Sequence, residues 1–183
     1  KKICSALVRS GIVVASGFAV GTDITAHLSA VRSGGKTIAV LGAGIGYEYP
    51  AENSQYIDEI AANGLFLSEY FPNSSANRFN FPMRNRILSG ISLGTAVIEA
   101  SERSGSLSTA SNTVSQGRDL WVIPPHDIFD PRYDGNKSLI RDGAIPLLYE
   151  HDIPCEYFEN YSHKPVKDSI SDMAKLGDAV PPI

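Results

Sequence analysis

Short apolar runs alternate along this chain with segments in which apolar residues recur at helical spacing. The clearest example begins with the apolar run at 12–15, continues through the turn at 16–23, and then places Ile24, Leu28 and Val31 at i, i+4 and i+7. An unbroken β-branched run is typical of a strand buried on both faces, whereas this spacing is typical of one helix face. The stretch therefore predicts a strand, a glycine turn and a helix.

The same unit recurs and predicts six buried strands separated by helices. The strands are expected at 12–15, 37–41, 65–69, 95–100, 120–123 and 145–149. Helices are expected at 1–10, 24–31, 53–62, 82–93, 106–115 and from 135 onward. Because parallel strands need crossovers that cover both faces of a sheet, this order predicts an α/β fold with a doubly wound, mostly parallel sheet.

Glycine-rich or polar segments leave the carboxyl ends of these strands, where ligands bind in such sheets. They are the turns at 17–21 and 42–46, the long loop at 70–81, and the turns that begin at Ser104 and Gly135. Glycine allows close backbone approach, and a helix that starts there directs free N–H groups toward an anion. Each turn alone is equally explained by packing, but five at one edge favour an extended polyanion over a mononucleotide.

Two arginines stand at the start of the helix that is expected to begin at Pro82. Cations in this position oppose the helix dipole, so a bound anion would remove the conflict. We therefore expect Arg84 and Arg86 to face phosphate. The alternative is that they pair with a nearby carboxylate such as Glu69 or Glu99.

Composition is that of a water-soluble domain, with 43% hydrophobic and 20% charged residues and no apolar run near the length of about 20 that a membrane span needs. Cys4 and Cys155 lie far apart and have no metal-ligand spacing, so we expect neither a disulfide nor a metal site. We also expect no cofactor. These features predict a cytoplasmic protein. The net charge is −4, yet residues 1–149 carry 13 acidic and 13 basic residues, and the excess lies in 150–183. We expect one domain at 1–149 and a linker or C-terminal arm at 150–183.

Several motifs in fixed order resemble the DprA/Smf family of DNA-processing proteins. They include SGFAVGTDITAH, GGKTIAVLGAGI, FNFPMRNRILSG, EASERSGSLSTA, GRDLWVIP and LIRDGA. The resemblance covers roughly residues 1–149 and implies an extended Rossmann-like fold. It also implies a non-catalytic protein that binds and protects single-stranded DNA and loads a RecA-type recombinase during natural transformation. Against the family pattern, we expect this sequence to lack the first strand with its glycine and arginine turn and the winged-helix domain that some members carry at the C-terminus. Ala51 and Glu52 stand where relatives can place a lysine.

The resemblance and the chemistry of the strand-end turns together give the candidate DNA contacts. Arginines neutralise phosphates, backbone N–H groups of glycine turns bind them, and a phenylalanine face stacks on any base. We expect Phe79 to stack on a base and Phe81 to staple the helix to the sheet. The full set is Gly17, Phe18, Ala19, Gly21, Arg78, Phe79, Phe81, Arg84, Asn85, Arg86, Ser104, Gly105, Ser106 and Lys137.

Two other functions fit the general fold. A nucleotide phosphoribohydrolase of the lysine-decarboxylase-like group carries a PGGxGTxxE loop, but this chain reads SERSGSLSTA there. A nucleotide sensor that only binds its ligand is the other alternative. Asp23 and His27 are expected to brace the first turn, and Ser104 and Ser106 have no histidine base nearby in sequence.

Apolar residues around the last helix and strand point to self-association. Relatives dimerise through this part of the fold, and an edge strand would otherwise expose unpaired backbone groups. We expect a homodimer whose interface includes Leu139, Ile140, Ile145, Leu147 and Leu148.

Overall fold

Strands and helices alternate over residues 1–160, which are the residues that the computed structural model describes. The strands are β1 (Val14–Ser16), β2 (Thr37–Val40), β3 (Gly64–Leu67), β4 (Gly94–Val97), β5 (Asp119–Val122) and β6 (Ile145–Pro146). The α-helices are α1 (Lys2–Arg9), α2 (Thr22–Arg32), α3 (Ile57–Asn63), α4 (Asn80–Gly90), α5 (Ser106–Ser115), α6 (Asp134–Arg141) and α7 (Asp152–Asn160). Two 3₁₀ helices span Ala51–Tyr56 and Pro131–Tyr133.

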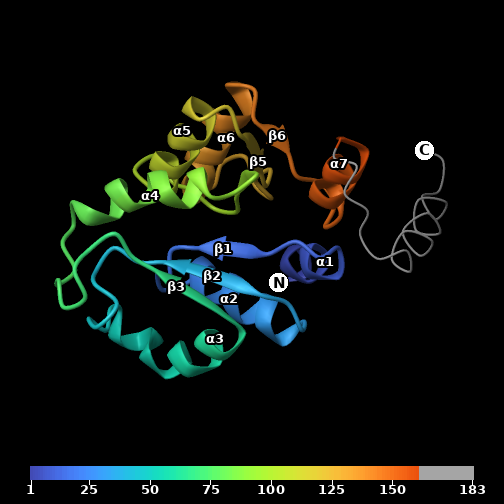
Figure 1. The fold of residues 1–183 in the computed structure, drawn as a ribbon. Coiled ribbons are helices and arrows are strands. Elements are labelled where there is room, and N and C mark those ends of the chain that lie inside the picture. Colours follow the sequence, from blue (N-terminus) through green and yellow to red (C-terminus); the bar gives the residue numbers. More distant parts are fainter. Residues whose placement is uncertain (161–183) are drawn as a thin grey trace, which may run out of the picture.

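All described strand pairs are parallel, which confirms the predicted α/β class. The strands form two three-stranded sheets, ordered β1-β2-β3 and β4-β5-β6, where one continuous sheet was expected. We call the part of the chain around sheet β1-β2-β3 the first half and the part around sheet β4-β5-β6 the second half. In Figure 1, β1 lies on the side of its sheet that faces the second half, and α4 runs across from one half to the other. Contacts between the halves are therefore made by helices and side chains.

Burial differs between the central strand and the edge strand of the first sheet. In β2, Thr37, Ala39 and Val40 are almost completely buried, because β1 and β3 lie on either side and helices cover the faces. In β3, by contrast, the side chain of Leu65 is 54% exposed. The expectation that every strand is buried on both faces is thus wrong for this edge.

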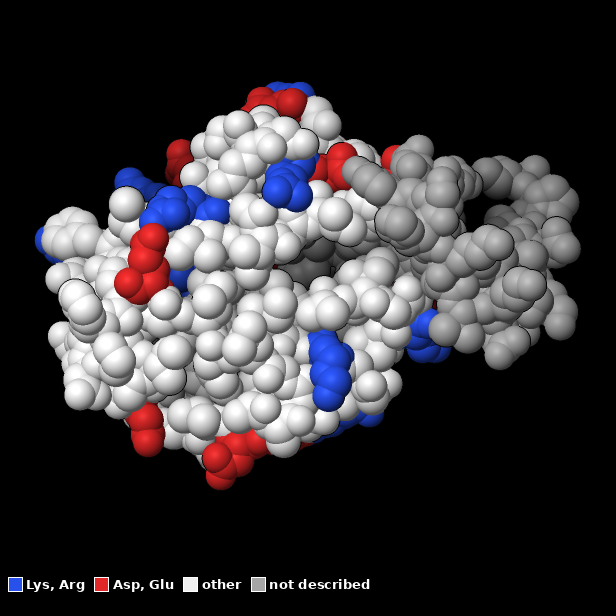
Figure 2. All heavy atoms as spheres, in the orientation of Figure 1, with Lys and Arg blue, Asp and Glu red and all other residues white. Residues whose placement is uncertain are grey.

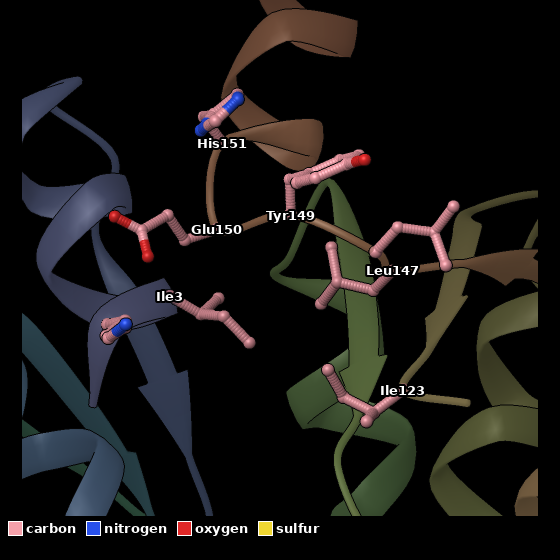
Figure 3. A pocket seen from close by; sticks show the side chains of 8 residues that line it. Ile3, Ile123, Leu147, Tyr149, Glu150 and His151 are labelled. Atoms are coloured by element: carbon pink, nitrogen blue, oxygen red, sulfur yellow. The ribbon is translucent and has the colours of Figure 1, made fainter. Parts of the chain in front are cut away.

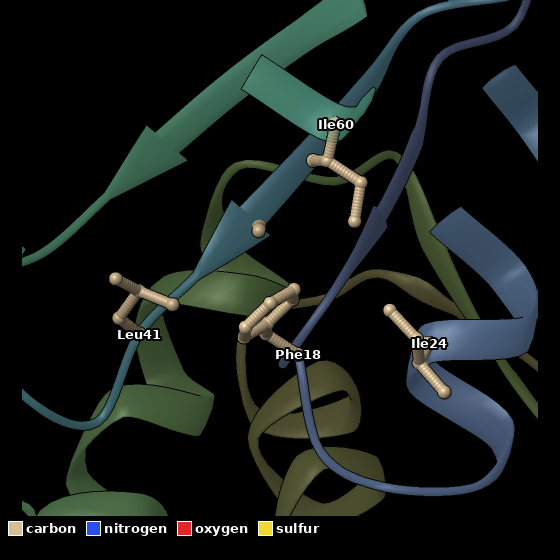
Figure 4. Packing of buried hydrophobic residues seen from close by; sticks show 5 residues of the cluster. Phe18, Ile24, Leu41 and Ile60 are labelled. Atoms are coloured by element: carbon tan, nitrogen blue, oxygen red, sulfur yellow. The ribbon is translucent and has the colours of Figure 1, made fainter. Parts of the chain in front are cut away.

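The core of the first half lies between the sheet and helices α2 and α3. Phe18, Ile24, Leu41 and Ile60 pack together there, from the turn after β1, from α2, from the end of β2 and from α3 (Figure 4). The burial of each apolar side chain of this size stabilises the folded state by about 1.5–3 kcal/mol. This cluster fixes the position of the turn that follows β1.

A second cluster fills the other half. Val97, Leu120 and Val122 from the strands pack against Ala110 of α5, and Leu139 and Ile140 of α6 lie against the same cluster. Because the buried residues of α5, which are Thr109, Ala110 and Thr113, are small, this helix can lie close to the sheet.

The third cluster extends the domain beyond its expected end. Ile153 and Tyr157 of α7 are buried against Trp121 and Leu147, and the Trp121 and Tyr157 ring centroids lie 5.5 Å apart. Residues 152–160 were expected to be part of a linker or arm, but the side chains of Ile153 and Tyr157 complete this core. The packed core therefore continues past the expected boundary at 149, while residues 161–183 of the expected arm lie outside the described residues.

The longest of the described helices, α2 and α4, have 11 residues each. None of the helices within residues 1–160 is long and apolar enough to cross a membrane.

A buried histidine joins α2 to the first sheet. Thr37 Oγ1 donates a hydrogen bond to Val14 O at 2.7 Å and lies 2.7 Å from His27 Nδ1. Since the hydroxyl proton is used, His27 Nδ1 must be the donor to Thr37. Burial lowers the pKa of His27 to about 4, although Asp23 acts in the opposite direction.

This burial predicts a loss of stability in mild acid. The unfolded chain takes up a proton on His27 near pH 6.5, whereas the folded protein does so only near pH 4, so stability is full above pH 6.5 and falls toward pH 4. When the pH is lowered from 7 to 5, protonation of His27 in the unfolded chain should reduce the free energy of unfolding by about 2 kcal/mol. Urea denaturation at the two pH values measures it.

The variant His27→Asn is the control, because its amide can still donate to Thr37 but does not titrate. Its stability should fall less than that of the wild-type protein over the same pH interval, by about the 2 kcal/mol assigned to His27. Equal losses in the two proteins would contradict the assignment.

Candidate nucleic-acid interface

The turn after β1 is held by the main chain and by one carboxylate. Phe18 adopts a left-handed backbone conformation with φ of 64°, and its ring is only 3% exposed and packs edge-on against Phe66. Asp23 accepts hydrogen bonds from Ser16 Oγ at 2.7 Å and from Ala19 N at 3.1 Å. This confirms the expected bracing role of Asp23. Phe18 thus contributes its ring to the core, while Ala19 and Gly21 lie at the surface.

Arg84 lies under this turn and is 5% exposed. Its Nη1 donates to Gly17 O at 2.7 Å and to Val40 O, which places one guanidinium nitrogen against the carboxyl ends of both β1 and β2. Burial lowers the pKa of Arg84, and the nearby Asp23 counteracts that shift. The side chain therefore serves the fold directly, whereas the sequence predicted that it faces phosphate at the surface.

Glycine at position 17 leaves room for two neighbouring side chains. A Cβ atom there would lie 2.6 Å from Arg84 Nη2 and 2.7 Å from Asp23 Oδ2. The glycine that the sequence suggested for close approach to a ligand thus permits close approach of an arginine and a carboxylate of the same chain.

The first turns of α4 contact the ends of strands in both sheets. Asn80 Nδ2 donates to Gly42 O after β2 at 3.0 Å, and Asn85 Nδ2 donates to Gly105 O after β4 at 3.3 Å. With the bonds of Arg84, these contacts connect the turns after β1, β2 and β4 through a single helix. Asn80 was not among the predicted site residues, although a polar residue between two phenylalanines at a helix start is a usable signal.

The helix itself differs from expectation in two ways. It starts at Asn80, before the expected start at Pro82. Met83 is 56% exposed and Ile91 is 47% exposed, although an amphipathic helix usually turns such apolar side chains inward. The reason is that Arg84, Asn85 and Ser89 occupy the buried face, where they satisfy backbone groups.

Arg86 forms an exposed ion pair with Glu69, the alternative that the sequence left open. The side chains of both residues are close to half exposed, so the pair contributes little to stability. The guanidinium stays accessible at the surface beside the loop that follows β3.

Arg78 and Phe79 form an exposed pair just before α4. The Arg78 guanidinium carbon lies 4.7 Å from the centre of the Phe79 ring, and Phe79 is 65% exposed. The ring of Phe81 is half-buried and lies 5.6 Å from the ring of Tyr49. These positions separate the two phenylalanines into one exposed ring and one packed ring.

The turn after β4 presents hydroxyl groups. Ser104 Oγ and Ser106 Oγ lie 2.7 Å apart, and α5 begins at Ser106 without a side-chain cap. Arg103 in the same turn is exposed and forms no ion pair within residues 1–160. This cation was missed, although it stands within the quoted motif.

The last predicted contact, Lys137, is tied to its own loop. Its Nζ donates to Ile128 O at 2.7 Å and lies 2.6 Å from Asp134 Oδ1. Its neighbour Asn136 is completely buried and binds Ala100 N, Ile98 O and Ile123 O. The amide of Asn136 thus fixes the ends of β4 and β5, a structural role that the sequence did not indicate.

The predicted dimer residues divide into buried and exposed groups. Leu139, Ile140 and Leu147 belong to or pack against core clusters. Ile145 and Leu148 are 42% and 66% exposed, at and beyond β6.

A cleft of about 380 Å³ lies beside these residues. Figure 3 shows Ile3 of α1 on one side, opposite Leu147 and Ile123, with Tyr149 and His151 beyond them. None of the candidate DNA contacts lines this cleft.

Charge on the face drawn in Figure 2 is mixed. Figure 2 shows lysine and arginine side chains around the α4 and α5 region of this face, with acidic side chains close by. A mixed surface gives no broad positive field, so binding of a polyanion here depends on individual arginines.

Parallel strands with glycine turns, accessible arginines and an exposed aromatic ring at their carboxyl ends define a Rossmann-like α/β protein with a candidate anion-binding edge. The chain belongs to the family of DNA recombination-mediator protein A, which matches residues 1–157.

Curated relatives carry the names DprA and Smf. The chain is 43% identical over 153 residues to Protein Smf of Synechocystis, covering 84% of this chain and 38% of the relative. It is 40% identical over 153 residues to DNA processing protein DprA of Bacillus subtilis, covering 84% of this chain and 50% of the relative. The chain therefore spans half or less of the length of these relatives.

Two solved structures have the same fold. DNA processing protein A of Streptococcus pneumoniae matches with a TM-score of 0.75 and 38% identity, over 85% of this chain and 54% of that chain. DNA processing protein A of Helicobacter pylori, described for its single-stranded DNA binding mode, matches with a TM-score of 0.78 and 30% identity. The match covers 87% of this chain and 73% of that chain.

The position of Arg84 predicts a large effect on stability. Arg84→Met leaves the carbonyl groups of Gly17 and Val40 without their donor in a buried place, which should lower the unfolding free energy by roughly 2–4 kcal/mol. Urea denaturation monitored by circular dichroism measures the loss.

Arg86→Met is the matched control two residues along the same helix. Because Arg86 pairs with Glu69 at the surface, this change should cost less than about 1 kcal/mol. Similar denaturation midpoints for the two variants would show that Arg84 does not hold the strand ends together.

Proposed function

We propose that this domain binds single-stranded DNA with little base preference. The observation that carries the proposal is the exposed Arg78–Phe79 pair at the start of α4, the helix that connects the strand-end turns of both sheets. A cation beside an exposed aromatic face provides one partner for phosphate and one for an unpaired base. The single-stranded DNA binding described for the Helicobacter pylori relative supports this choice of ligand.

Phosphate groups would contact accessible donors along the edge. Arg78 and Arg86 supply positive charge, and the starts of α2 and α5 supply backbone N–H groups near Gly21 and Ser106. Arg84 and Asn85 act indirectly, because their hydrogen bonds hold the Gly17 and Gly105 turns in place. Lys137 and the Ser104 hydroxyl extend the proposed contacts toward the second sheet.

For the cell, we propose that the protein is cytoplasmic and non-catalytic. It would protect incoming DNA and pass it to a RecA-type recombinase during natural transformation. The family, recombination-mediator protein A, and the DNA-processing names of its relatives support this role. A phosphoribohydrolase is disfavoured because the SERSGSLSTA turn lacks both the double glycine and the downstream glutamate of the PGGxGTxxE loop. Calorimetry with mononucleotides beside a DNA-binding assay separates the nucleotide sensor from the proposal.

Binding should weaken with salt in proportion to the phosphates that are neutralised. The slope of log affinity against log salt should be about −0.7 per phosphate, and Arg78→Ala should make it less negative by about that amount. Fluorescence anisotropy with a labelled oligothymidylate at several salt concentrations measures the slope. Absence of binding by the wild-type chain at low salt would contradict the proposal.

Replacement of Phe79 and of Phe81 by alanine should have different effects. Phe79→Ala should weaken binding by the equivalent of about 1–3 kcal/mol and leave the salt slope unchanged, because stacking is hardly screened. Phe81→Ala should mainly lower the melting temperature, since its ring packs against Tyr49. Loss of melting temperature without loss of binding in Phe79→Ala would reverse the assignment.

Self-association through the β6 edge is also part of the proposal. The exposed side chain of Ile145 lies in this short strand and that of Leu148 just beyond it, and the strand has a free edge among the described residues. The double variant Ile145→Glu, Leu148→Glu should be a monomer by light scattering at concentrations where the wild-type chain is a dimer. A wild-type monomer at high concentration would contradict the dimer.

A further inference from the structure

We propose that the two loops after β2 and β3 form a second base-stacking surface for the same DNA strand. We name this surface the ledge and define it as residues 42–49 and 70–74. The inference rests on the proposed function and extends it, because it assigns a binding surface for unpaired bases beyond the Arg78–Phe79 pair.

The two loops of the ledge are joined backbone to backbone. Gly44 N donates to Ser74 O at 2.9 Å, and Gly46 N donates to Pro72 O at 2.7 Å. At position 44, a Cβ atom would lie 2.0 Å from Phe71 O, so the contact requires glycine. The side chains on the ledge are therefore carried by a fixed backbone, although they stand in loops.

Apolar and aromatic side chains of the ledge point into solvent. Phe71 is 85% exposed and Ile45 is 60% exposed, while Tyr47 and Tyr49 are 41% and 47% exposed. An exposed apolar surface on an otherwise well-packed protein marks a contact site. Three aromatic rings on a joined backbone suit flat ligands, and unpaired bases are flat ligands that stack on such rings.

The ledge is continuous with the proposed DNA site. The ring of Tyr49 lies 5.6 Å from that of Phe81, and Asn80 Nδ2 binds Gly42 O. The start of α4, which carries Arg78 and Phe79 immediately before it, is thus fixed against the ledge. A DNA strand that extends from the Phe79 ring along this edge reaches the ledge next. For this reason we assign the surface to DNA and not to a protein partner.

Charge defines what the ledge can recognise. Residues 42–49 and 70–74 include no lysine or arginine and one acidic residue, Glu48. The ledge therefore offers ring faces without phosphate neutralisation, and its contribution to affinity should not depend on salt. Duplex DNA hides its base faces, so this surface selects single strands.

The test compares oligonucleotides of two lengths with the variant Phe71→Ala. Labelled oligothymidylates of about 4 and about 16 nucleotides span the usual range of single-strand site sizes. In anisotropy titrations of the 183-residue chain, Phe71→Ala should weaken binding of the long oligonucleotide about 5- to 100-fold. Binding of the short one and the salt slope should stay unchanged.

Phe129→Ala is the matched control. Phe129 is 84% exposed, as Phe71 is, but stands in the loop between β5 and α6. Its removal should leave both affinities unchanged, and both variants should keep the wild-type melting temperature because neither ring is packed. Phe71→Trp should retain long-strand affinity, whereas Phe71→Leu, which is apolar but not aromatic, should lose it.

Each other outcome overturns the inference in a distinguishable way. Unchanged long-strand affinity in Phe71→Ala rejects the ledge while leaving DNA binding at Phe79 intact. Equal affinities for Phe71→Leu and Phe71→Trp reject stacking, and an equal loss in Phe129→Ala rejects the location. If the wild-type chain binds neither oligonucleotide at low salt, the proposed function fails and the ledge fails with it.

Discussion

One buried guanidinium determines how the rest of this molecule fits together. Arg84 Nη1 binds the carbonyl oxygens at the ends of β1 and β2, and its neighbour Asn85 reaches the turn after β4. Strand-end carbonyls have no partner within the sheet, and leaving them buried and unpaired is costly. The helix start satisfies them, and in doing so it places Arg78, Phe79 and Arg86 at the polar edge.

The repeating pattern of apolar runs and helical spacing was sufficient to predict the α/β class and the parallel pairing. It did not predict the separation into two sheets, because strand periodicity does not specify which edges pair. It also failed at α7, where a nine-residue helix containing Pro154 gives little periodic signal, yet Ile153 and Tyr157 close a core around Trp121. Short elements of this kind gain their stability from tertiary packing, which no local pattern records.

Several of the candidate contacts lie at the carboxyl ends of the strands, but the sequence did not specify what each side chain does there. Glycines and arginines at strand ends are visible in the sequence. The same residue types, however, can either bind a ligand or form hydrogen bonds with buried backbone groups of their own chain. Arg84 and Arg86 stand two residues apart and illustrate the ambiguity: one is buried on carbonyl groups, and the other is exposed beside Glu69. The residue at which α4 begins sets which side chains lie on its buried face, and it therefore determines which of the two arginines is buried.

The division of the strands into two sheets has a consequence for how the molecule opens. Within each sheet, neighbouring strands share backbone hydrogen bonds, but β1 and β4 belong to different sheets. The seam between the halves is therefore closed by side chains from α1, α4 and α7. Water can enter such a seam without first breaking a strand ladder, so backbone amides along the seam that are not bonded within a ladder can exchange with solvent before either sheet unfolds.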